Sequence, residues 1–139
     1  MNRFVLYTDI VSLYQLGHPT VVQRVQAHPP NQLVVSVITV EEQLTGWYTK
    51  LRRARKRDEL ARAYLRLTKA VRLLRTFEIE TFSEPAIIRY KQLRTTLRNI
   101  GKNDLRIAAI ALENRDTVVT RNLHDFQQVP GLTIKDWSK

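Results

Sequence analysis

The sequence predicts an α/β fold: a mostly parallel sheet of four to five strands, flanked by helices. Short apolar runs recur at residues 3–7, 33–38, 77–82, 117–120 and 132–137, and segments with helical periodicity separate them. Strands that alternate with helices pair in parallel, because the intervening helix carries the chain back across the sheet. No repeat, linker or low-complexity segment divides the 139 residues, so we expect a single domain spanning 1–139.

The first half of the chain supplies two of the expected strands. Residues 3–7 form a buried strand. Two short helices follow, one at 10–16 that ends before Pro19 and one at 21–27 that ends before Pro29 and Pro30. Residues 33–38, "LVVSVI", read as a second buried strand. Thr39 is a plausible N-cap for the next helix, with Glu42 three residues later as its capping-box partner.

The second half continues the alternation. A basic run at 50–57, "KLRRARKR", precedes a long amphipathic helix, and "FEIETF" is a third strand. Ser83 caps the following helix, and Gly101 separates it from an alanine-rich helix opened by Asn103 or Asp104. "TVVT" and "LTIKDW" supply the last two strands. The expected inward-facing residues are Leu60, Tyr64, Leu67, Val71 and Leu74 of the long helix, and Ile87, Ile88, Leu93 and Leu97 of the helix after Ser83.

The composition narrows the possible functions. With no cysteine, the chain has no disulfide framework, thiolate zinc site or cysteine nucleophile. No apolar window reaches the length of a membrane helix, so we expect a cytoplasmic protein without membrane contact. Lys and Arg number 23 against 13 Asp and Glu, a net charge of +10, which favours nucleic acid as a partner over an acidic protein or mere solubility.

Acidic and amide side chains fall where ligands gather in such folds, at the carboxyl ends of the strands. Asp9 follows the first strand, Glu42 the second, Asp104 opens a helix, and Asn122 and Asp125 follow the fourth strand. Clustered carboxylates select a hard divalent ion such as Mg²⁺ or Mn²⁺, which can activate water for phosphodiester cleavage. Each of these five residues also has a structural alternative. Asp9, Glu42 and Asp104 could serve as helix caps, and Asn122 and Asp125 could hold a turn.

Five stretches in this order resemble the PIN-domain nuclease family, in particular the VapC-type toxins of bacterial toxin–antitoxin pairs. They are "LYTDIVSL", "SVITVEEQLTG", "FEIETFSEPA", "GKNDLRIAAIAL" and "VVTRNLHDFQQVPGL" with a later "DW", and the likeness covers nearly the whole chain. It implies a three-layer PIN domain that uses Mg²⁺ or Mn²⁺ to cut RNA of the tRNA or rRNA class. It also implies a VapB-type antitoxin as partner, with the chain forming a homodimer or a heterocomplex with that antitoxin.

The resemblance also assigns catalytic residues. The family's acid in "ITVxEL" falls on Glu42, the acid opening the alanine-rich helix on Asp104, and the acid after "VTR" on Asn122, with Asp125 as a second candidate. The family's first acid, a metal ligand placed directly before a threonine, falls on Tyr7. A phenol is neutral at pH 7 and a poor ligand for Mg²⁺, so this substitution predicts weakened metal binding and impaired catalysis.

Three explanations of Tyr7 remain open at the level of sequence. The chain is an inactivated version of a working toxin, a natural degenerate relative that still binds its antitoxin and acts in operon autoregulation, or an active enzyme in which Asp9 serves as metal ligand. Asp9 lies two residues on and would share a face with Tyr7 if the strand extended that far. For Asp9 to replace the missing aspartate at position 7 as a metal ligand, the backbone would still have to shift.

The basic and aromatic residues suggest partner surfaces. Arg106 and Arg121 adjoin expected site residues and are candidates for binding RNA phosphates. Arg52, Arg53 and Arg55 of the basic run could guide RNA or simply face solvent. Core packing explains most of the apolar positions at Trp47, Tyr48 and in the long helix, and by resemblance these helices also form the antitoxin groove and the homodimer contact.

Overall fold

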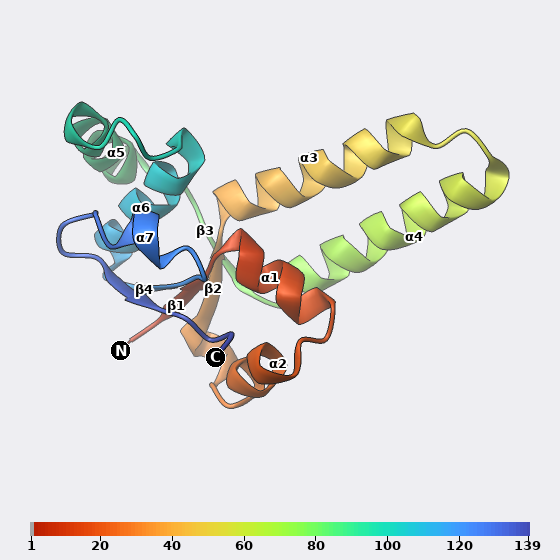
Figure 1. Ribbon diagram of the computed structural model, residues 1–139, viewed down its shortest axis with the longest axis horizontal. Helices are drawn as coiled ribbons and strands as arrows, with labels where there is room; N and C mark the ends of the chain where they lie inside the picture. Colours follow the sequence, from red (N-terminus) through yellow and green to blue (C-terminus); the bar gives the residue numbers. More distant parts are fainter. Residues whose placement is uncertain (1) are drawn as a thin grey trace.

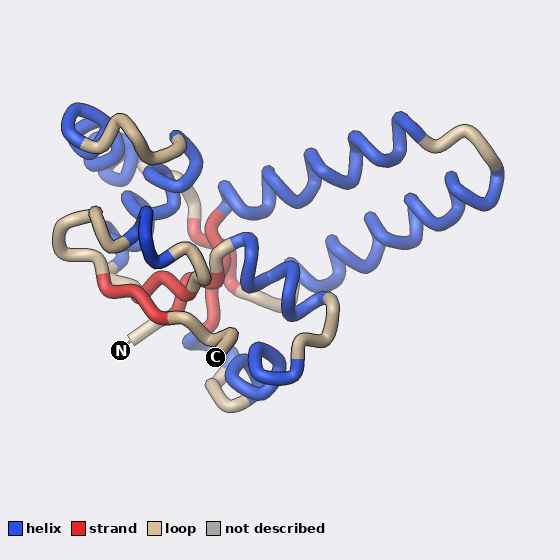
Figure 2. The backbone as a smooth tube through the Cα atoms, viewed as in Figure 1, coloured by secondary structure: helices blue, strands red, loops and turns tan. Residues whose placement is uncertain are grey.

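The computed structural model describes residues 2–139 and contains the predicted sheet. Its five strands lie in the order β3-β2-β1-β4-β5, and every neighbouring pair is parallel (Figures 1 and 2). The central strand β1 therefore has β2 on one side and β4 on the other. The strands are β1 (Phe4–Leu6), β2 (Leu33–Ser36), β3 (Glu78–Glu80), β4 (Thr117–Val119) and β5 (Thr133–Lys135).

Helices cover both faces of the sheet, which gives the three layers expected. On one face, Val5, Val34 and Val118 pack against α5, α6 and α7. On the other face, Leu6 and Val35 pack against α1, α2 and the end of α4. The helices are α1 (Thr8–Gln15), α2 (Pro19–Gln26), α3 (Val37–Arg53), α4 (Arg57–Leu74), α5 (Glu84–Thr96), α6 (Lys102–Asn114) and α7 (Leu123–Phe126), with a short 3₁₀ turn at Pro30–Gln32.

Helices α3 and α4 form a long hairpin that projects away from the sheet (Figure 1). The predicted apolar stripe of α4 is wrong at three of its five positions, because Leu60, Tyr64 and Val71 are exposed. Leu74 of that stripe is buried as predicted, and the other buried positions of α4 are Ala63 and Ala70, whose small side chains let the two helices approach closely. Only the C-terminal end of α4 reaches the core, so a helix with this apolar content leaves much of its surface open. Among the described residues, the large hydrophobic side chains exposed outside the predicted stripe are Leu16 after α1, Tyr48 and Leu65 in the hairpin, Ile79 in β3, and Ile88, expected to face inward, in α5.

The helix starts differ from the predicted ones in two places that matter for the site. Helix α3 begins at Val37, and Ser36 rather than Thr39 is its N-cap, because Ser36 Oγ accepts a hydrogen bond from the backbone N of Thr39 at 3.1 Å. Helix α1 begins at Thr8, so Asp9 lies inside its first turn instead of capping it. Because α1 and α3 begin within two residues of the ends of β1 and β2, the polar residues that follow these strands lie near the edge of the sheet.

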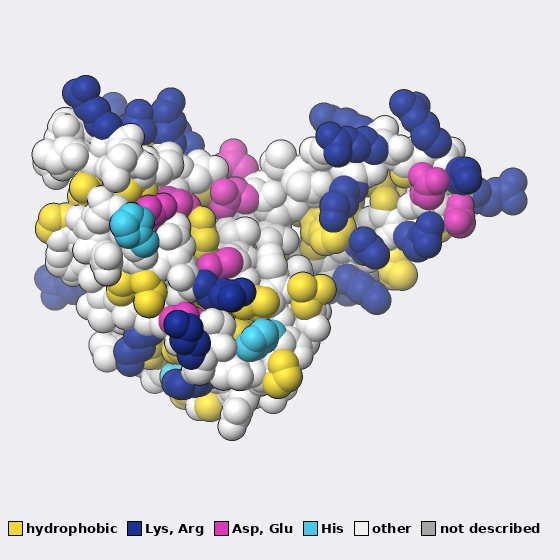
Figure 3. All heavy atoms as spheres, viewed as in Figure 1, with side chains coloured by type: hydrophobic (Ala, Val, Ile, Leu, Met, Phe, Trp, Pro, Cys, Tyr) yellow, Lys and Arg dark blue, Asp and Glu magenta, His cyan; other side chains and the backbone are white. Residues whose placement is uncertain are grey.

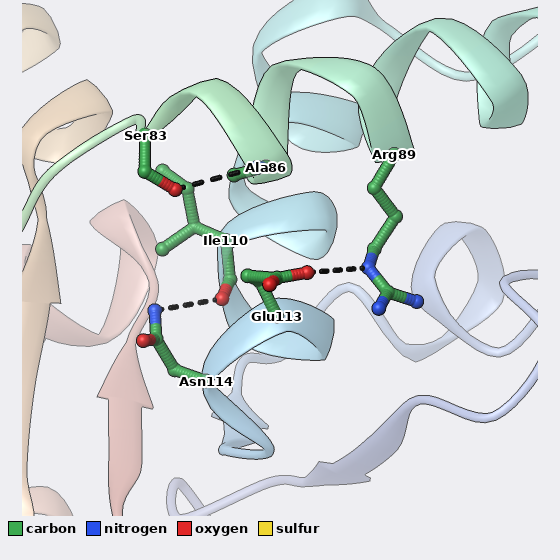
Figure 4. A network of polar contacts seen from close by, with 6 residues as sticks. All are labelled: Ser83, Ala86, Arg89, Ile110, Glu113 and Asn114. Carbon is green, nitrogen blue, oxygen red and sulfur yellow. Dashed lines mark hydrogen bonds and ion pairs between the residues drawn. The ribbon is translucent and has the colours of Figure 1, made fainter.

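Helices α5 and α6 pack against each other on one face of the sheet (Figure 4). Ser83 caps α5 as predicted, accepting a hydrogen bond from the backbone N of Ala86 at 3.3 Å. Arg89 Nε and Glu113 Oε2 form an ion pair at 3.1 Å that links the two helices (Figure 4). Helix α6 begins at Lys102 with Gly101 as N-cap, so Asp104 lies in its first turn, with its side chain free for other partners.

Candidate active site

The predicted site residues gather at the carboxyl ends of the central strands. Tyr7 directly follows β1, and its backbone N donates to the carbonyl oxygen of Val119 on β4 at 2.9 Å. Thr120 follows β4, and Ser36 at the end of β2 starts α3. Because parallel strands end at one edge, three connections bring their side chains to the same place.

Tyr7 and Asp104 are in direct contact. The Tyr7 hydroxyl donates a hydrogen bond to Oδ1 of Asp104 at 2.5 Å, across 97 positions of sequence. The Tyr7 ring is half-buried and lies edge-on to Phe126, with 5.2 Å between the ring centroids. Burial, the hydrogen bond to Asp104 and the nearby carboxylates all raise the pKa of Tyr7. The phenol is therefore neutral and acts as a hydrogen-bond donor.

Asp104 lies among other acids. Burial raises its pKa, the charges of Glu42 and Asp125 raise it further, and the hydrogen bond from Tyr7 opposes them by stabilising the carboxylate. Glu42 comes from α3, Asp104 from α6 and Asp125 from α7, so three helices bring these carboxylates within electrostatic reach of one another. This mutual repulsion is what a bound cation relieves in an acidic site.

Glu42 is held from two sides and is not a capping residue. Thr8 Oγ1 donates to Glu42 Oε1 at 2.9 Å, and Asn103 Nδ2 donates to Glu42 Oε2 at 3.3 Å. The hydroxyl oxygens of Thr8 and Thr39 lie 3.2 Å apart, which connects this arrangement to the buried start of α3. Glu42 thus has a fixed orientation at the edge of the acidic group.

Asp9 is directed at the loop after β4. Its Oδ2 accepts hydrogen bonds from the backbone N of Arg121 at 2.9 Å and from Thr120 Oγ1 at 3.3 Å. Its Oδ1 is buried and has no hydrogen-bond partner within residues 2–139. Burial raises the pKa of Asp9, opposed by these hydrogen bonds. Asp9 therefore fastens α1 to the loop that carries Asn122.

Asn122 and Asp125 pair with each other. The Asn122 side chain caps α7 by accepting from the backbone N of Asp125 at 3.4 Å, and Asn122 Nδ2 donates to Asp125 Oδ2 at 3.1 Å. The turn-forming role considered from the sequence is therefore present. Asp125 also contributes to the acidic field at Asp104.

Of the predicted RNA-binding arginines, Arg106 lies nearest the acids. Its Nη1 donates to Asn103 Oδ1 at 2.9 Å, and its guanidinium lies 5.3 Å from the centroid of the Tyr90 ring. Asn103 thus links Arg106 to Glu42. These residues border a hollow of about 500 Å³, here named the site hollow, lined by Glu41, Glu42, Thr45, Gly46, Asn103 and Arg106.

The other arginines lie apart from this hollow. The exposed Arg121 contacts the site through its backbone N, which donates to Asp9. Arg52, Arg53 and Arg55 are exposed at the tip of the α3–α4 hairpin, well away from the strand ends (Figure 1). Of the predicted arginines, Arg106 borders the site hollow, and Arg121 lies near Asp9, whose pKa its charge lowers.

The acidic residues do not form a complete divalent-metal site. Within residues 2–139, no group of three or more Asp, Glu or His side chains is spaced to hold a metal ion. One oxygen of Asp104 is occupied by the Tyr7 hydroxyl, and both oxygens of Glu42 accept hydrogen bonds. Oxygen donors of the right kind are present, and the phenol of Tyr7, a poor ligand for Mg²⁺, lies among them.

Sequence reasoning missed three residues of this arrangement. Thr8 and Asn103 orient Glu42, and Thr120 Oγ1 contacts both Asp9 and the backbone N of Asn122. Only their places in the sequence could have pointed to these residues. Thr8 directly follows the residue after β1, Asn103 precedes Asp104, and Thr120 ends the "TVVT" run. Hydroxyl and amide side chains at such places are common, so position alone did not single them out.

Comparison with known proteins agrees with this geometry. The family model described as the PIN domain matches residues 10–132. Ribonuclease VapC1 of Haemophilus influenzae strain R2866 is 30% identical over 142 residues, covering 98% of both chains. Ribonuclease VapC2 of Rickettsia felis is 39% identical over 70 residues, and that match spans about half of each protein, 48% of this chain and 52% of the relative.

Solved structures support the same assignment. VapBC-1 from nontypeable Haemophilus influenzae superposes with a TM-score of 0.78 at 26% identity, covering 98% of both chains. VapBC2 from Rickettsia felis, bound to a DNA fragment from its promoter, gives a TM-score of 0.75 at 26% identity and covers 96% of this chain and 98% of that one. The chain therefore belongs to the PIN-domain family and, within it, to the VapC-type ribonucleases.

Proposed function

We propose that this chain is a VapC-type toxin whose metal-dependent ribonuclease site is disarmed at Tyr7. The intact site would use Asp104 and Glu42 as principal acids, with Asn122 and Asp125 in support, and would take Mg²⁺ or Mn²⁺ to cleave tRNA or rRNA. The net charge of +10 supports a polyanionic substrate. In the absence of a third carboxylate, cleavage by the chain as it stands is weak or absent.

The observation that carries this proposal is the contact between Tyr7 and Asp104. The phenol lies at the end of the central strand and donates at 2.5 Å to the carboxylate that faces it. A tyrosine here removes a negative charge, fills space with a ring and occupies an oxygen of Asp104. All three effects weaken cation binding in the same direction.

Asp9 does not take over as metal ligand in this proposal. Its Oδ2 holds the loop after β4 through Arg121 N and Thr120, and it lies inside α1 instead of on an extended β1. Turning toward Asp104 would break these contacts. The alternation argument from the sequence fails because the strand ends at Leu6.

The proposed protein partner is a VapB-type antitoxin. The structural relatives described above are VapBC complexes, and this chain carries a mainly apolar hollow of about 690 Å³ between α1, α2, α3 and α4, whose edge also includes Trp47, Lys50 and Arg66. Its lining includes Tyr14, Val22, Leu73 and Leu16, and the last of these is 83% exposed. An apolar antitoxin segment would cover these side chains. A Leu16→Asp variant should then lose co-purification with the co-expressed antitoxin, and retention of the complex would contradict this site.

The second candidate function is a non-catalytic binder of the antitoxin that acts in operon autoregulation. It is favoured by the same two features together, an acidic site closed by Tyr7 and an open apolar hollow. It differs from the first candidate in one respect, because restoring an acid at Tyr7 would not restore cleavage.

Metal binding tests the proposal without requiring a known RNA. Titration calorimetry with MnCl₂ should show weak or no binding to the chain as it is, and binding at least tenfold tighter to Tyr7→Asp. Tyr7→Phe serves as the matched control that keeps the ring and adds no charge. Equal Mn²⁺ affinity of Tyr7→Asp and Tyr7→Phe would overturn the proposal.

A further inference from the structure

A continuous depression runs from the acidic site to the tip of the hairpin. Next to the site hollow lies a second hollow of about 330 Å³, here named the bridging hollow, and the two share Glu42 and Gly46. Beyond it lies the tip hollow of about 310 Å³ between α3 and α4, which shares Trp47 and Lys50 with the bridging hollow. Shared lining residues make the three hollows one surface along α3.

The tip hollow is strongly cationic and contains one aromatic ring. Its lining includes Trp47 and the side chains of Lys50, Arg53, Arg62 and Arg66, with Glu59 as the one acid that borders it. Lysine and arginine side chains cover the hairpin in the space-filling view (Figure 3). Four cations against one carboxylate leave an excess of positive charge that a polyanion would neutralise.

These cations are available for a ligand. Lys50, Arg53 and Arg66 form no ion pair within the described residues 2–139, and Arg62 has only a long 3.5 Å contact with the exposed Asp58. Lys50 Nζ lies 4.5 Å from the centroid of the Trp47 ring. A planar base could take the place of this ammonium over the ring while the ammonium turns to bind the phosphate, and stacking beside a cation is the usual combination in single-strand binding surfaces.

Gly46 keeps the depression open between the acids and Trp47. Glu42, Gly46 and Lys50 are spaced by four residues on α3 and so share one face of the helix. A Cβ at Gly46 would meet no atom within 4 Å, so neither packing nor backbone strain accounts for glycine here. Glycine inside a helix costs about 1 kcal/mol relative to alanine, and close approach of a ligand is a physical reason for it.

We infer that single-stranded RNA lies along α3, with a base stacked on Trp47 and phosphates at Lys50, Arg53 and Arg66. The distance from Glu42 to Arg53 is about 16 Å at the helical rise of about 1.5 Å per residue, enough for a few nucleotides. Arg53 belongs to this path, whereas Arg52 and Arg55 do not border it. The inference rests on the proposed ribonuclease function and assigns the surface that holds the substrate strand.

Binding of an oligouridylate of about 12 nucleotides, followed by fluorescence anisotropy in EDTA, tests the path separately from cleavage. The double variant Lys50→Gln/Arg66→Gln should bind about tenfold more weakly, and its slope of log affinity against log salt should fall by about 1.4. The matched control Arg72→Gln/Arg75→Gln removes the same charge from α4 and its end but does not border the hollows. Equal losses from the two double variants would overturn the inference.

Stacking on Trp47 has its own test. Trp47→Leu should weaken oligouridylate binding about tenfold, whereas Tyr48→Leu, a change to an exposed neighbour outside the hollows, should leave it nearly unchanged. RNA should also quench the fluorescence of Trp47, while the buried Trp137 provides a constant background. Tighter binding of polyglutamate than of oligouridylate, without dependence on Trp47, would overturn the RNA path in favour of an acidic protein segment.

Different results would contradict the ribonuclease function and the RNA path along α3. RNA cleavage by Tyr7→Asp, together with equal RNA affinity of both double variants, would keep the ribonuclease and remove the path along α3. Loss of RNA binding in Lys50→Gln/Arg66→Gln, with no cleavage by Tyr7→Asp, would keep the RNA surface and remove the proposed chemistry.

Discussion

The hydroxyl of Tyr7, at the end of the central strand, donates a 2.5 Å hydrogen bond to Asp104 on α6. The bond joins the first turn of the α6 helix to the edge of the sheet, and its acceptor is half-buried among other acids. The contact therefore stabilises the fold while it occupies the carboxylate on which the chemistry would depend.

Removing only this hydroxyl should destabilise the protein. Tyr7→Phe leaves the Asp104 carboxylate without its donor, and hydrogen bonds to charged groups contribute about 1–2 kcal/mol when partly exposed. Urea denaturation at neutral pH should show a loss of that size. Tyr14→Phe is the matched control, because the Tyr14 hydroxyl makes no side-chain hydrogen bond within residues 2–139 and its removal should change stability little. Equal stability of the two variants would mean that the Tyr7–Asp104 bond contributes nothing.

A second acidic group, away from the site, should control the pH dependence of stability. Glu80 at the end of β3 is 7% exposed, and neither of its carboxylate oxygens has a hydrogen-bond partner among the described residues. Burial and the adjacent Asp116 carboxyl raise the pKa of Glu80 to about 8, against 4.5 ordinarily, while Arg3 lowers it and Glu78 raises it. Glu80 is therefore protonated in the folded protein at neutral pH.

The stability should consequently fall as the pH rises through the interval between these values. Below about pH 4.5 both states hold the proton, and between pH 4.5 and 8 the unfolded chain releases it first, so unfolding becomes easier. Glu80→Gln should remove this loss and stabilise the protein by about 2 kcal/mol or more at pH 8. Glu78→Gln removes only the smallest of the charges that raise the pKa of Glu80, so its pH-dependent gain should be much smaller than that of Glu80→Gln. Parallel stability curves for Glu80→Gln and the unaltered chain from pH 5 to 8 would contradict this assignment.

The cap of α3 should affect both stability and the orientation of Glu42. Ser36 is fully buried, and its Oγ bonds the backbone N and the hydroxyl of Thr39, which in turn contacts Thr8 beside Glu42. Ser36→Ala should cost about 1 kcal/mol, as loss of an N-cap does.

The equivalent change at α5 separates the two effects. Ser83→Ala removes the same kind of cap from a helix that carries none of the acids, and it should cost a similar amount. In the Tyr7→Asp background, only Ser36→Ala should also weaken Mn²⁺ binding. Equal Mn²⁺ affinities of Tyr7→Asp/Ser36→Ala and Tyr7→Asp/Ser83→Ala would show that the orientation of Glu42 does not depend on this cap.

The sheet and the helix order were predictable because they follow from short-range patterns. Runs such as "LVVS" and "TVV" are apolar on both faces, which marks strands covered by two helical layers, and all five strands are found. The collection of acids at one edge was predictable for the same reason. Helix starts were not, because Ser36 and Thr39 are both good caps and tertiary packing decides between them.

Long-range partners and solvent exposure could not be predicted. The hydrogen bond of Tyr7 to Asp104 depends on how α6 is placed against β1, and the link from Asn103 to Glu42 spans 61 positions. The stripe of α4 was wrong at Leu60, Tyr64 and Val71 because the helix projects with its partner α3 instead of lying on the sheet (Figure 1). Periodicity identifies an amphipathic helix but does not say how much of its length is covered.

Within residues 2–139 no helix is long and apolar enough to cross a membrane.

Cleavage of RNA by the Tyr7→Asp variant tests the central claim most directly. Total tRNA and rRNA should be incubated with MnCl₂ and the unaltered chain, Tyr7→Asp, or Tyr7→Asp/Asp104→Asn. Tyr7→Asp alone should cut RNA, since only this variant has both carboxylates at the end of β1 and the start of α6. Cutting by the unaltered chain at the rate of Tyr7→Asp, or no cutting by any of the three, would contradict it.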